Sequence, residues 1–190
     1  MIPISALIAA AGYSSRMATG KALLPFDDNT TFAGHLISSY YDNGCEPVIL
    51  VVNPFLDISK LKTGNFIPVI NKNPEKGRNW SIHLGICLVP PGFSCFINNV
   101  DNPYITADLI RKMVRELSPD SFVIPVFQDH GGHPVLLGSN MVTYIRDRKE
   151  VVDFRETLKM FNRVEVPCAD GQVLWNINTP EDYRKFRAKF

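Results

Sequence analysis

Residues 10–21 read AAGYSSRMATGK and combine a glycine-containing turn with two cations, Arg16 and Lys21. Gly12 allows the backbone to come close to a ligand, and successive backbone N–H groups in such a turn form a concavity that binds anions. An arginine fork and a compact lysine charge are suited to phosphate oxygens. The stretch therefore indicates a phosphate site. A plain turn with two solvated charges is the alternative that the spacing leaves open.

This stretch departs from the two best-known phosphate-binding loops. It is not a Walker A motif, because Ser15 stands where the first glycine belongs and Ala22 replaces the serine or threonine that holds magnesium. It is not a dinucleotide fingerprint either, because Ser14 and Ser15 occupy the spacings of the later glycines. A P-loop NTPase and a dehydrogenase are therefore disfavoured.

Short apolar runs bounded by turn signals are the elements that must position these residues. They predict strands buried on both faces at 6–9, 48–52, 66–70, 95–97, 122–126 and 134–137. Helical patterns lie between them at 30–43 and 106–117, the second with Thr106 as N-cap. This alternation predicts an α/β fold, a three-layer α/β/α sandwich with a mostly parallel central sheet.

The end of the chain carries a further strand and helix signal. A turn at Asp170-Gly171 is expected to lead into a strand through the sequence QVLWNI, and Thr179 with Pro180 begins a helix. Ligands of such sheets bind outside the carboxyl ends of the strands. That rule selects the loop at 10–21, the segment NNVDNP at 98–103 and the segment NIN at 176–178.

Composition narrows the class of protein. The 190 residues are 45% hydrophobic and carry a net charge of +1, which gives no general attraction to nucleic acid or to an anionic membrane. Four cysteines form no CxxC pair, as expected for a reduced, cytoplasmic protein, and no targeting or membrane-spanning segment is recognised. With no linker or repeat, residues 1–190 are expected to form one domain.

Five segments in order resemble the motifs of nucleotidyltransferases with a GT-A-like, Rossmann-related fold, and most of all the molybdenum-cofactor cytidylyltransferases and their guanylyltransferase relatives. The segments are AAGYSSRMATGK at 10–21, GRNWSIHLGI at 77–86, VDNPYIT at 100–106, GGHPVLL at 131–137 and NINTPEDY at 176–183. The resemblance spans nearly the whole chain. It implies transfer of a nucleoside monophosphate from an NTP to an acceptor phosphate, with release of pyrophosphate, and so gives the two cations a role.

The resemblance also implies roles for individual residues. Arg16, Lys21 and Asp101 would be catalytic, Lys21 at the α-phosphate and Arg16 at the β- and γ-oxygens. Asp101 and Asn178 would bind Mg²⁺, with Mn²⁺ as a substitute. The residues expected to bind the nucleotide are Ala10, Ala11, Gly12, Ser14, Ser15, Arg16, Lys21, Gly77, Asn79 and Ser81. His133 would face the acceptor.

Several of these residues are also suited to purely structural roles, and these alternatives stay open. Asp101 is also suited to a helix-entry cap, His133 to a structural position before a proline, and Trp80 to the core instead of stacking on a ligand. The family pattern has aspartates where this chain has Asn176 and Asn178. An amide oxygen can coordinate magnesium but adds no charge, so we expect weaker metal binding by the protein itself.

The resemblance specifies the nucleotide base and the acceptor less closely than it specifies the site residues. Ala10-Ala11-Gly12 and the GHPV segment favour CTP, whereas the asparagines at 176 and 178 favour GTP. The implied acceptor is a molybdopterin-type cofactor, with factors that mature molybdenum enzymes as further partners. Sugar-phosphate or alcohol-phosphate acceptors, and a non-catalytic nucleotide-binding protein, are the other hypotheses.

Overall fold

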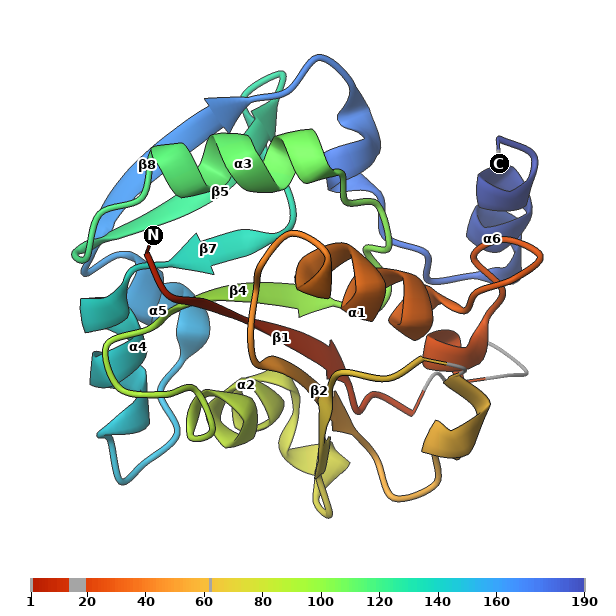
Figure 1. The fold of residues 1–190 in the computed structure, drawn as a ribbon, viewed down its shortest axis with the longest axis horizontal. Coiled ribbons are helices and arrows are strands. Elements are labelled where there is room, and N and C mark those ends of the chain that lie inside the picture. Colours follow the sequence, from red (N-terminus) through yellow and green to blue (C-terminus); the bar gives the residue numbers. More distant parts are fainter. Residues whose placement is uncertain (1, 14–19, 62, 190) are drawn as a thin grey trace.

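The computed structural model describes residues 2–13, 20–61 and 63–189. Eight strands form one sheet in the order β3-β2-β1-β4-β7-β5-β6, and β8 pairs with β5 (Figure 1). The strands are β1 (Ile4–Ala10), β2 (Val48–Val52), β3 (Ile67–Ile70), β4 (Ser94–Asn99), β5 (Ser121–Phe127), β6 (His130–Gly131), β7 (Val135–Leu137) and β8 (Asn162–Pro167). The β3-β2-β1-β4 and β5-β8 pairings are parallel, and β7 is antiparallel to both β4 and β5.

Helices cover both faces of this sheet. They are α1 (Phe32–Tyr41), α2 (Arg78–Ile86), α3 (Ala107–Arg115), α4 (Ser139–Arg146), α5 (Phe154–Leu158) and α6 (Pro180–Arg187). Short 3₁₀ helices are η1 (Lys21–Leu23), η2 (Ile58–Leu61), η3 (Pro74–Lys76) and η4 (Gly171–Leu174). One apolar cluster joins the sheet to α1, α3 and α6, and a second joins its other face to α2, α4 and α5. The predicted three-layer, mostly parallel architecture is confirmed.

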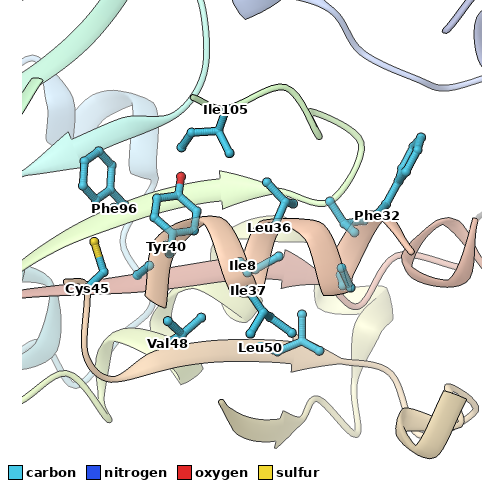
Figure 2. Close-up of a cluster of buried hydrophobic side chains, with 14 of the residues drawn as sticks. Ile8, Phe32, Leu36, Ile37, Tyr40, Cys45, Val48, Leu50, Phe96 and Ile105 are labelled. Atoms are coloured by element: carbon cyan, nitrogen blue, oxygen red, sulfur yellow. The ribbon is translucent and has the colours of Figure 1, made fainter. Parts of the chain in front are cut away.

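The first of these clusters centres on α1. Figure 2 shows Leu36, Ile37 and Tyr40 of this helix turned toward the strands, where they meet Ile8 and Leu50 among others. Alternate residues of β1, β2 and β4 enter the two clusters, so these central strands have apolar side chains on both faces. That burial is why their apolar runs were recognisable in the sequence.

Local helix signals also correspond to the structure. The Thr106 hydroxyl accepts from Leu109 N at the start of α3, and Thr179 caps α6 in a reciprocal capping box with Asp182. The expected strand after Asp170-Gly171 is wrong. Asp170 instead caps η4, because its side chain accepts a hydrogen bond from the backbone N–H of Gln172.

The C-terminal helix α6 is held against the segment that precedes α1. The Tyr183 hydroxyl donates to the Pro25 carbonyl at 3.0 Å and Arg187 to the Phe26 carbonyl at 3.2 Å, so α6 packs beside the loop before α1 (Figure 1).

Cys45, Cys87, Cys95 and Cys168 are free thiols. Among the described residues, no helix combines the length and apolar character needed to cross a membrane.

Candidate active site

Two neighbouring parallel strands bring the first two predicted segments together. Ala9 of β1 lies opposite Asn99 of β4, and Val100 N donates to the Ala9 carbonyl at 3.1 Å just past the paired region. The chain then continues to Gly12 on one strand and to Asp101 on the other. Both segments therefore leave the same carboxyl edge of the sheet, as the topology rule predicts.

Lys21 connects the three predicted segments. The neighbouring Ala22 is buried and anchors η1 in the core. The Lys21 ammonium donates to Asp101 Oδ2 at 3.2 Å and to Asn178 Oδ1 at 2.6 Å, across 80 and 157 positions of sequence. The side chains of Lys21 and Asp101 are only 14% and 22% exposed, so this ion pair is largely shielded from water.

A buried asparagine next to Asp101 holds the NIN segment in place. Asn102 is 3% exposed, and its amide donates to the Trp175 carbonyl at 2.6 Å and to Asn176 Oδ1 at 2.9 Å. Ile177 N donates to the carbonyl of Asp101 at 2.8 Å. The two asparagines therefore differ, because Asn176 binds Asn102 whereas Asn178 binds Lys21. The asparagine-rich turn around Asp101 was the available signal for Asn102, which the sequence analysis missed.

The cap of α6 fixes the backbone of Asn178. Asp182 Oδ2 accepts from the backbone N–H groups of Asn178 at 3.1 Å and Thr179 at 2.9 Å, and from the Thr179 hydroxyl at 2.8 Å. These bonds, the Thr179 hydroxyl first, lower the pKa of Asp182. The negatively charged Asp182 therefore fixes the backbone from which the Asn178 side chain extends.

A cavity of about 280 Å³ opens beside Lys21. Its lining comprises Ala9, Ala10, Ala11, Gly12, Lys21, Pro74, Gly77, Arg78, Ser81, Asn99, Val100 and Asp101. A Cβ atom placed on Gly12 or Gly77 would meet nothing within 4 Å, so both glycines leave open space for a ligand. The structure thus gathers seven of the predicted site residues around one cavity.

Other predicted site residues lie elsewhere or have structural partners. The Asn79 amide donates to Asp153 Oδ2 at 3.2 Å, at the N-cap of α5, and Asn79 does not line the cavity. The Ser81 hydroxyl accepts from the buried Asn71 amide at 3.0 Å. Ser14, Ser15 and Arg16 lie outside the described residues.

Trp80 has neighbours of its own and is not among the residues that line the cavity. The Lys76 ammonium lies 4.7 Å from the centroid of its ring, and the His83 ring stacks on it at 5.9 Å between centroids. These contacts favour the packing alternative for Trp80 over stacking on a nucleotide.

His133 lies between β6 and β7, with its backbone N–H bonded to the Val173 carbonyl at 2.8 Å. Burial lowers the pKa of its imidazole to about 4, and the positive charge of Arg78 acts in the same direction while Asp101 opposes it. The ring is therefore neutral at pH 7. Its Nδ1 atom is buried and has no hydrogen-bond partner among the described residues.

The carboxylate and amide oxygens of Asp101 and Asn178 are the kind of ligands that a hard cation prefers. The Asp101 Oδ1 atom is buried without a hydrogen-bond partner in the described part of the chain, and the Asn178 amide oxygen binds the same ammonium as Asp101 Oδ2. No group of three or more His, Cys, Asp or Glu side chains suited to a metal occurs among the described residues. A cation here would need further oxygen ligands from a bound substrate.

Comparison with known proteins decides the family. The family model described as "MobA-like NTP transferase domain" matches residues 6–164. The chain belongs to this family. It is 26% identical over 186 residues to the molybdenum cofactor cytidylyltransferase of Escherichia coli K12, covering 96% of this chain and 95% of the relative.

Further relatives and structures agree with this membership. The chain is 24% identical to a probable molybdenum cofactor guanylyltransferase of Mycobacterium tuberculosis H37Rv, covering 94% of this chain and 90% of the relative. The crystal structure of Rv0371c from Mycobacterium tuberculosis H37Rv superposes with a TM-score of 0.82 at 21% identity and covers 97% of each chain. That protein was also solved in complex with manganese, at a TM-score of 0.74 and 19% identity, again covering 97% of each chain. The fold is thus that of the nucleotidyltransferases, and the predicted family is confirmed.

Proposed function

We propose that this protein transfers CMP from CTP to the phosphate group of a molybdopterin-type acceptor and releases pyrophosphate. The observation that carries the proposal is the Lys21 ammonium, held between Asp101 and Asn178 beside the cavity at the carboxyl edge of the sheet. A family whose relatives are named for this chemistry supports it. The proposal treats residues 1–190 as one catalytic domain.

The reaction is a displacement at phosphorus. An oxygen of the acceptor phosphate forms a bond to the α-phosphorus of CTP, and the bond from that phosphorus to the oxygen that joins the α- and β-phosphates breaks, so that this oxygen leaves as a terminal oxygen of pyrophosphate. The pyrophosphate keeps the electron pair of the broken bond, and no proton has to move. The protein's task is to position two anions and to neutralise the charge that develops between them.

Lys21 supplies the neutralising charge on the protein side. Its ammonium is shielded from water, so its field at the α-phosphate is stronger than that of a solvated lysine. Gly12, Gly77 and Ser81 border the space for the nucleoside. Arg16 is assigned to the β- and γ-phosphates by the motif alone.

Asp101 and Asn178 are proposed to hold a divalent cation, Mg²⁺ or Mn²⁺, together with phosphate oxygens. The bound cation would supply charge neutralisation at those oxygens. The unpartnered Asp101 Oδ1 supports this assignment. Because Asn178 contributes no charge, binding of the cation to the protein without nucleotide should be weak.

The second candidate is GTP as the donor. The two side-chain amides of Asn176 and Asn178 favour it, and relatives named guanylyltransferases align over 94% of the chain. Ala11, which borders the cavity and belongs to the Ala10-Ala11-Gly12 segment typical of the cytidylyltransferases that the chain resembles, favours CTP. His133 is proposed to face the acceptor. We place the enzyme in the cytoplasm, with its free thiols as support, and its product with the factors that mature molybdenum enzymes.

Pyrophosphate release tests the proposal. Purified protein is incubated with Mg²⁺, molybdopterin and each of the four NTPs, and release is expected with CTP well above the others. Lys21→Ala and Asp101→Ala should each lower the rate at least 100-fold, whereas Lys112→Ala, which removes an exposed lysine of α3, should not. Nucleotide binding without release under all conditions would favour the non-catalytic alternative. Preference for GTP would favour the second candidate.

A further inference from the structure

Arg78 is a cation in the site that no sequence motif singled out. It is the first residue of α2 and lines the cavity together with Lys21 and Asp101. Its guanidinium carbon lies 5.6 Å from the centroid of the Phe154 ring of α5. The arginine therefore spans from the nucleotide cavity toward a second element that does not line it.

Within residues 2–13, 20–61 and 63–189, no carboxylate forms an ion pair with Arg78. None of the ion pairs formed among the described residues includes it. The residue as a whole is exposed, yet the protein around the guanidinium lowers its pKa, and the nearby positive charge of Arg155 acts the same way while Asp101 opposes both. An anionic ligand in the cavity would therefore meet a guanidinium that no carboxylate of the described residues has paired with.

Burial, and after it the positive charge of Arg78, lowers the pKa of His133, so the imidazole senses this guanidinium. The His133 Nδ1 atom is buried and has no hydrogen-bond partner among the described residues, so it is open to a ligand. Arg78, Arg155 and His133 come from α2, α5 and the β6–β7 connection, three segments that are far apart in the sequence. Of these three, only Arg78 also borders the nucleotide cavity.

We propose that Arg78, together with His133, binds the attacking phosphate of the acceptor, so that the ligand class of this subsite is a phosphomonoester. The inference rests on the proposed function. Two phosphates must approach each other during transfer, and each needs its own cation. Lys21 faces the nucleotide from the β1 side, and Arg78 faces the second phosphate from the α2 side. The planar guanidinium can donate two parallel hydrogen bonds to phosphate oxygens, which an ammonium cannot.

The subsite can be tested with glycerol 3-phosphate as the phosphomonoester probe. The protein is saturated with Mg²⁺ and α,β-methylene-CTP, which cannot transfer its nucleotide, and the His133 ring resonances are followed by NMR during titration. We expect saturable shifts in the wild type and at least tenfold weaker binding in Arg78→Met. Arg78→Lys, which keeps the charge without the fork, should fall between the two. Arg111→Met is the matched control, because Arg111 is an exposed arginine of α3.

The outcomes separate this inference from the proposed function. Unchanged glycerol 3-phosphate affinity in folded Arg78→Met, or a tenfold loss of α,β-methylene-CTP affinity instead, would overturn the subsite. If Arg78→Met does not fold, the Arg78→Lys titration decides in the same way. With molybdopterin as acceptor, Arg78→Met should raise the acceptor KM at least tenfold and leave the nucleotide KM unchanged. Absence of pyrophosphate release from the wild type would reject the proposed function while the probe titration still reports on the subsite.

Discussion

Replacing Lys21 by methionine should have opposite effects on metal binding and on turnover. The ammonium now occupies the space between Asp101 Oδ2 and Asn178 Oδ1, at 3.2 Å and 2.6 Å. Methionine keeps an unbranched side chain of similar length and removes the charge. Both oxygens then become available to a divalent cation, but the positive charge proposed to act on the α-phosphate is lost.

The size of the gain in metal affinity follows from the contacts. A pair of unit charges 3.2 Å apart attracts by about 5 kcal/mol at an effective dielectric constant of about 20. After desolvation, a hydrogen bond to a charged group contributes about 1.5–3 kcal/mol net. A metal ion that displaces the ammonium must give up this amount. Because about 1.4 kcal/mol corresponds to a factor of ten, Lys21→Met should bind Mn²⁺ about 10- to 100-fold more tightly.

Electron paramagnetic resonance of free Mn²⁺, titrated with nucleotide-free protein, measures this affinity. Pyrophosphate release in the same preparations should fall about 100- to 1,000-fold. Lys112→Met serves as control, because Lys112 also pairs with an aspartate, at 2.8 Å, but on the exposed surface of α3. It should change neither quantity.

Equal Mn²⁺ affinity in Lys21→Met and in the wild type would refute the reasoning, since the ammonium would then not compete for the aspartate. A second variant locates the effect. Adding Asp101→Asn to Lys21→Met should remove the gained affinity, because the only charged ligand oxygen is lost. Retention of the gain would mean that Mn²⁺ binds at another place.

Three further substitutions test other parts of the structure. Gly85→Ala should destabilise the fold by about 1–3 kcal/mol in urea unfolding, because its Cβ would overlap the Leu7 side chain of β1; an unchanged midpoint would contradict the packing of α2. Asn102→Ala should cost a similar amount and slow turnover about 10- to 100-fold by releasing Asn176, and normal turnover would show that this asparagine only stabilises the fold. Burial lowers the pKa of His35 from 6.5 to about 4, so the unfolded chain binds more protons in this range and stability falls as the pH drops from about 6.5 to 4. His35→Gln should remove up to about 3 kcal/mol of this loss in unfolding at pH 7.5 and pH 4.5, and an identical pH dependence would exclude His35 as its source.

The central strands could be predicted because burial on both faces leaves a plain apolar run. VILVV at 48–52 matches β2 residue for residue, and each of its residues is buried. Strand β8 was missed because its sequence, NRVEVP, is polar and mostly exposed, and its pairing with β5 is a contact over about 40 positions. A peripheral strand with exposed, polar residues has no apolar run in its sequence, so the sequence pattern does not predict it.

The error at 172–177 has a similar cause. QVLWNI has the apolar content of a strand, but the side chain of Asp170 and the carbonyl of Asp101 accept its backbone N–H groups at Gln172 and Ile177. These bonds replace the partners that a neighbouring strand would have offered. One of the two acceptors lies more than 70 positions away, where no local pattern can point to it.

The residues of the candidate site also differ in how well the sequence predicts them. The sequence predicted that the segments of Lys21, Asp101 and Asn178 share one edge because each belongs to a motif with a recognisable order, and the structure brings these three side chains together. Arg78 was not selected because its place in the cavity and its contact with Phe154 depend on segments far apart in the sequence. A charged residue directly after Gly77, inside a quoted motif, was the available signal.

The contacts among Lys21, Asp101 and Asn178 give a physical reason for an asparagine at position 178. Lys21 and Asp101 form an ion pair, and the Asn178 amide oxygen accepts a second hydrogen bond from the ammonium without adding charge. An aspartate at 178 would make this edge of the sheet negative, which would attract a divalent cation but repel the triphosphate that arrives without one. Under the proposed function, the amide would therefore favour joint binding of the cation and the nucleotide. Because the Lys21 ammonium is hydrogen-bonded to Asp101 and Asn178, a cation would need the phosphate oxygens of the nucleotide to displace it.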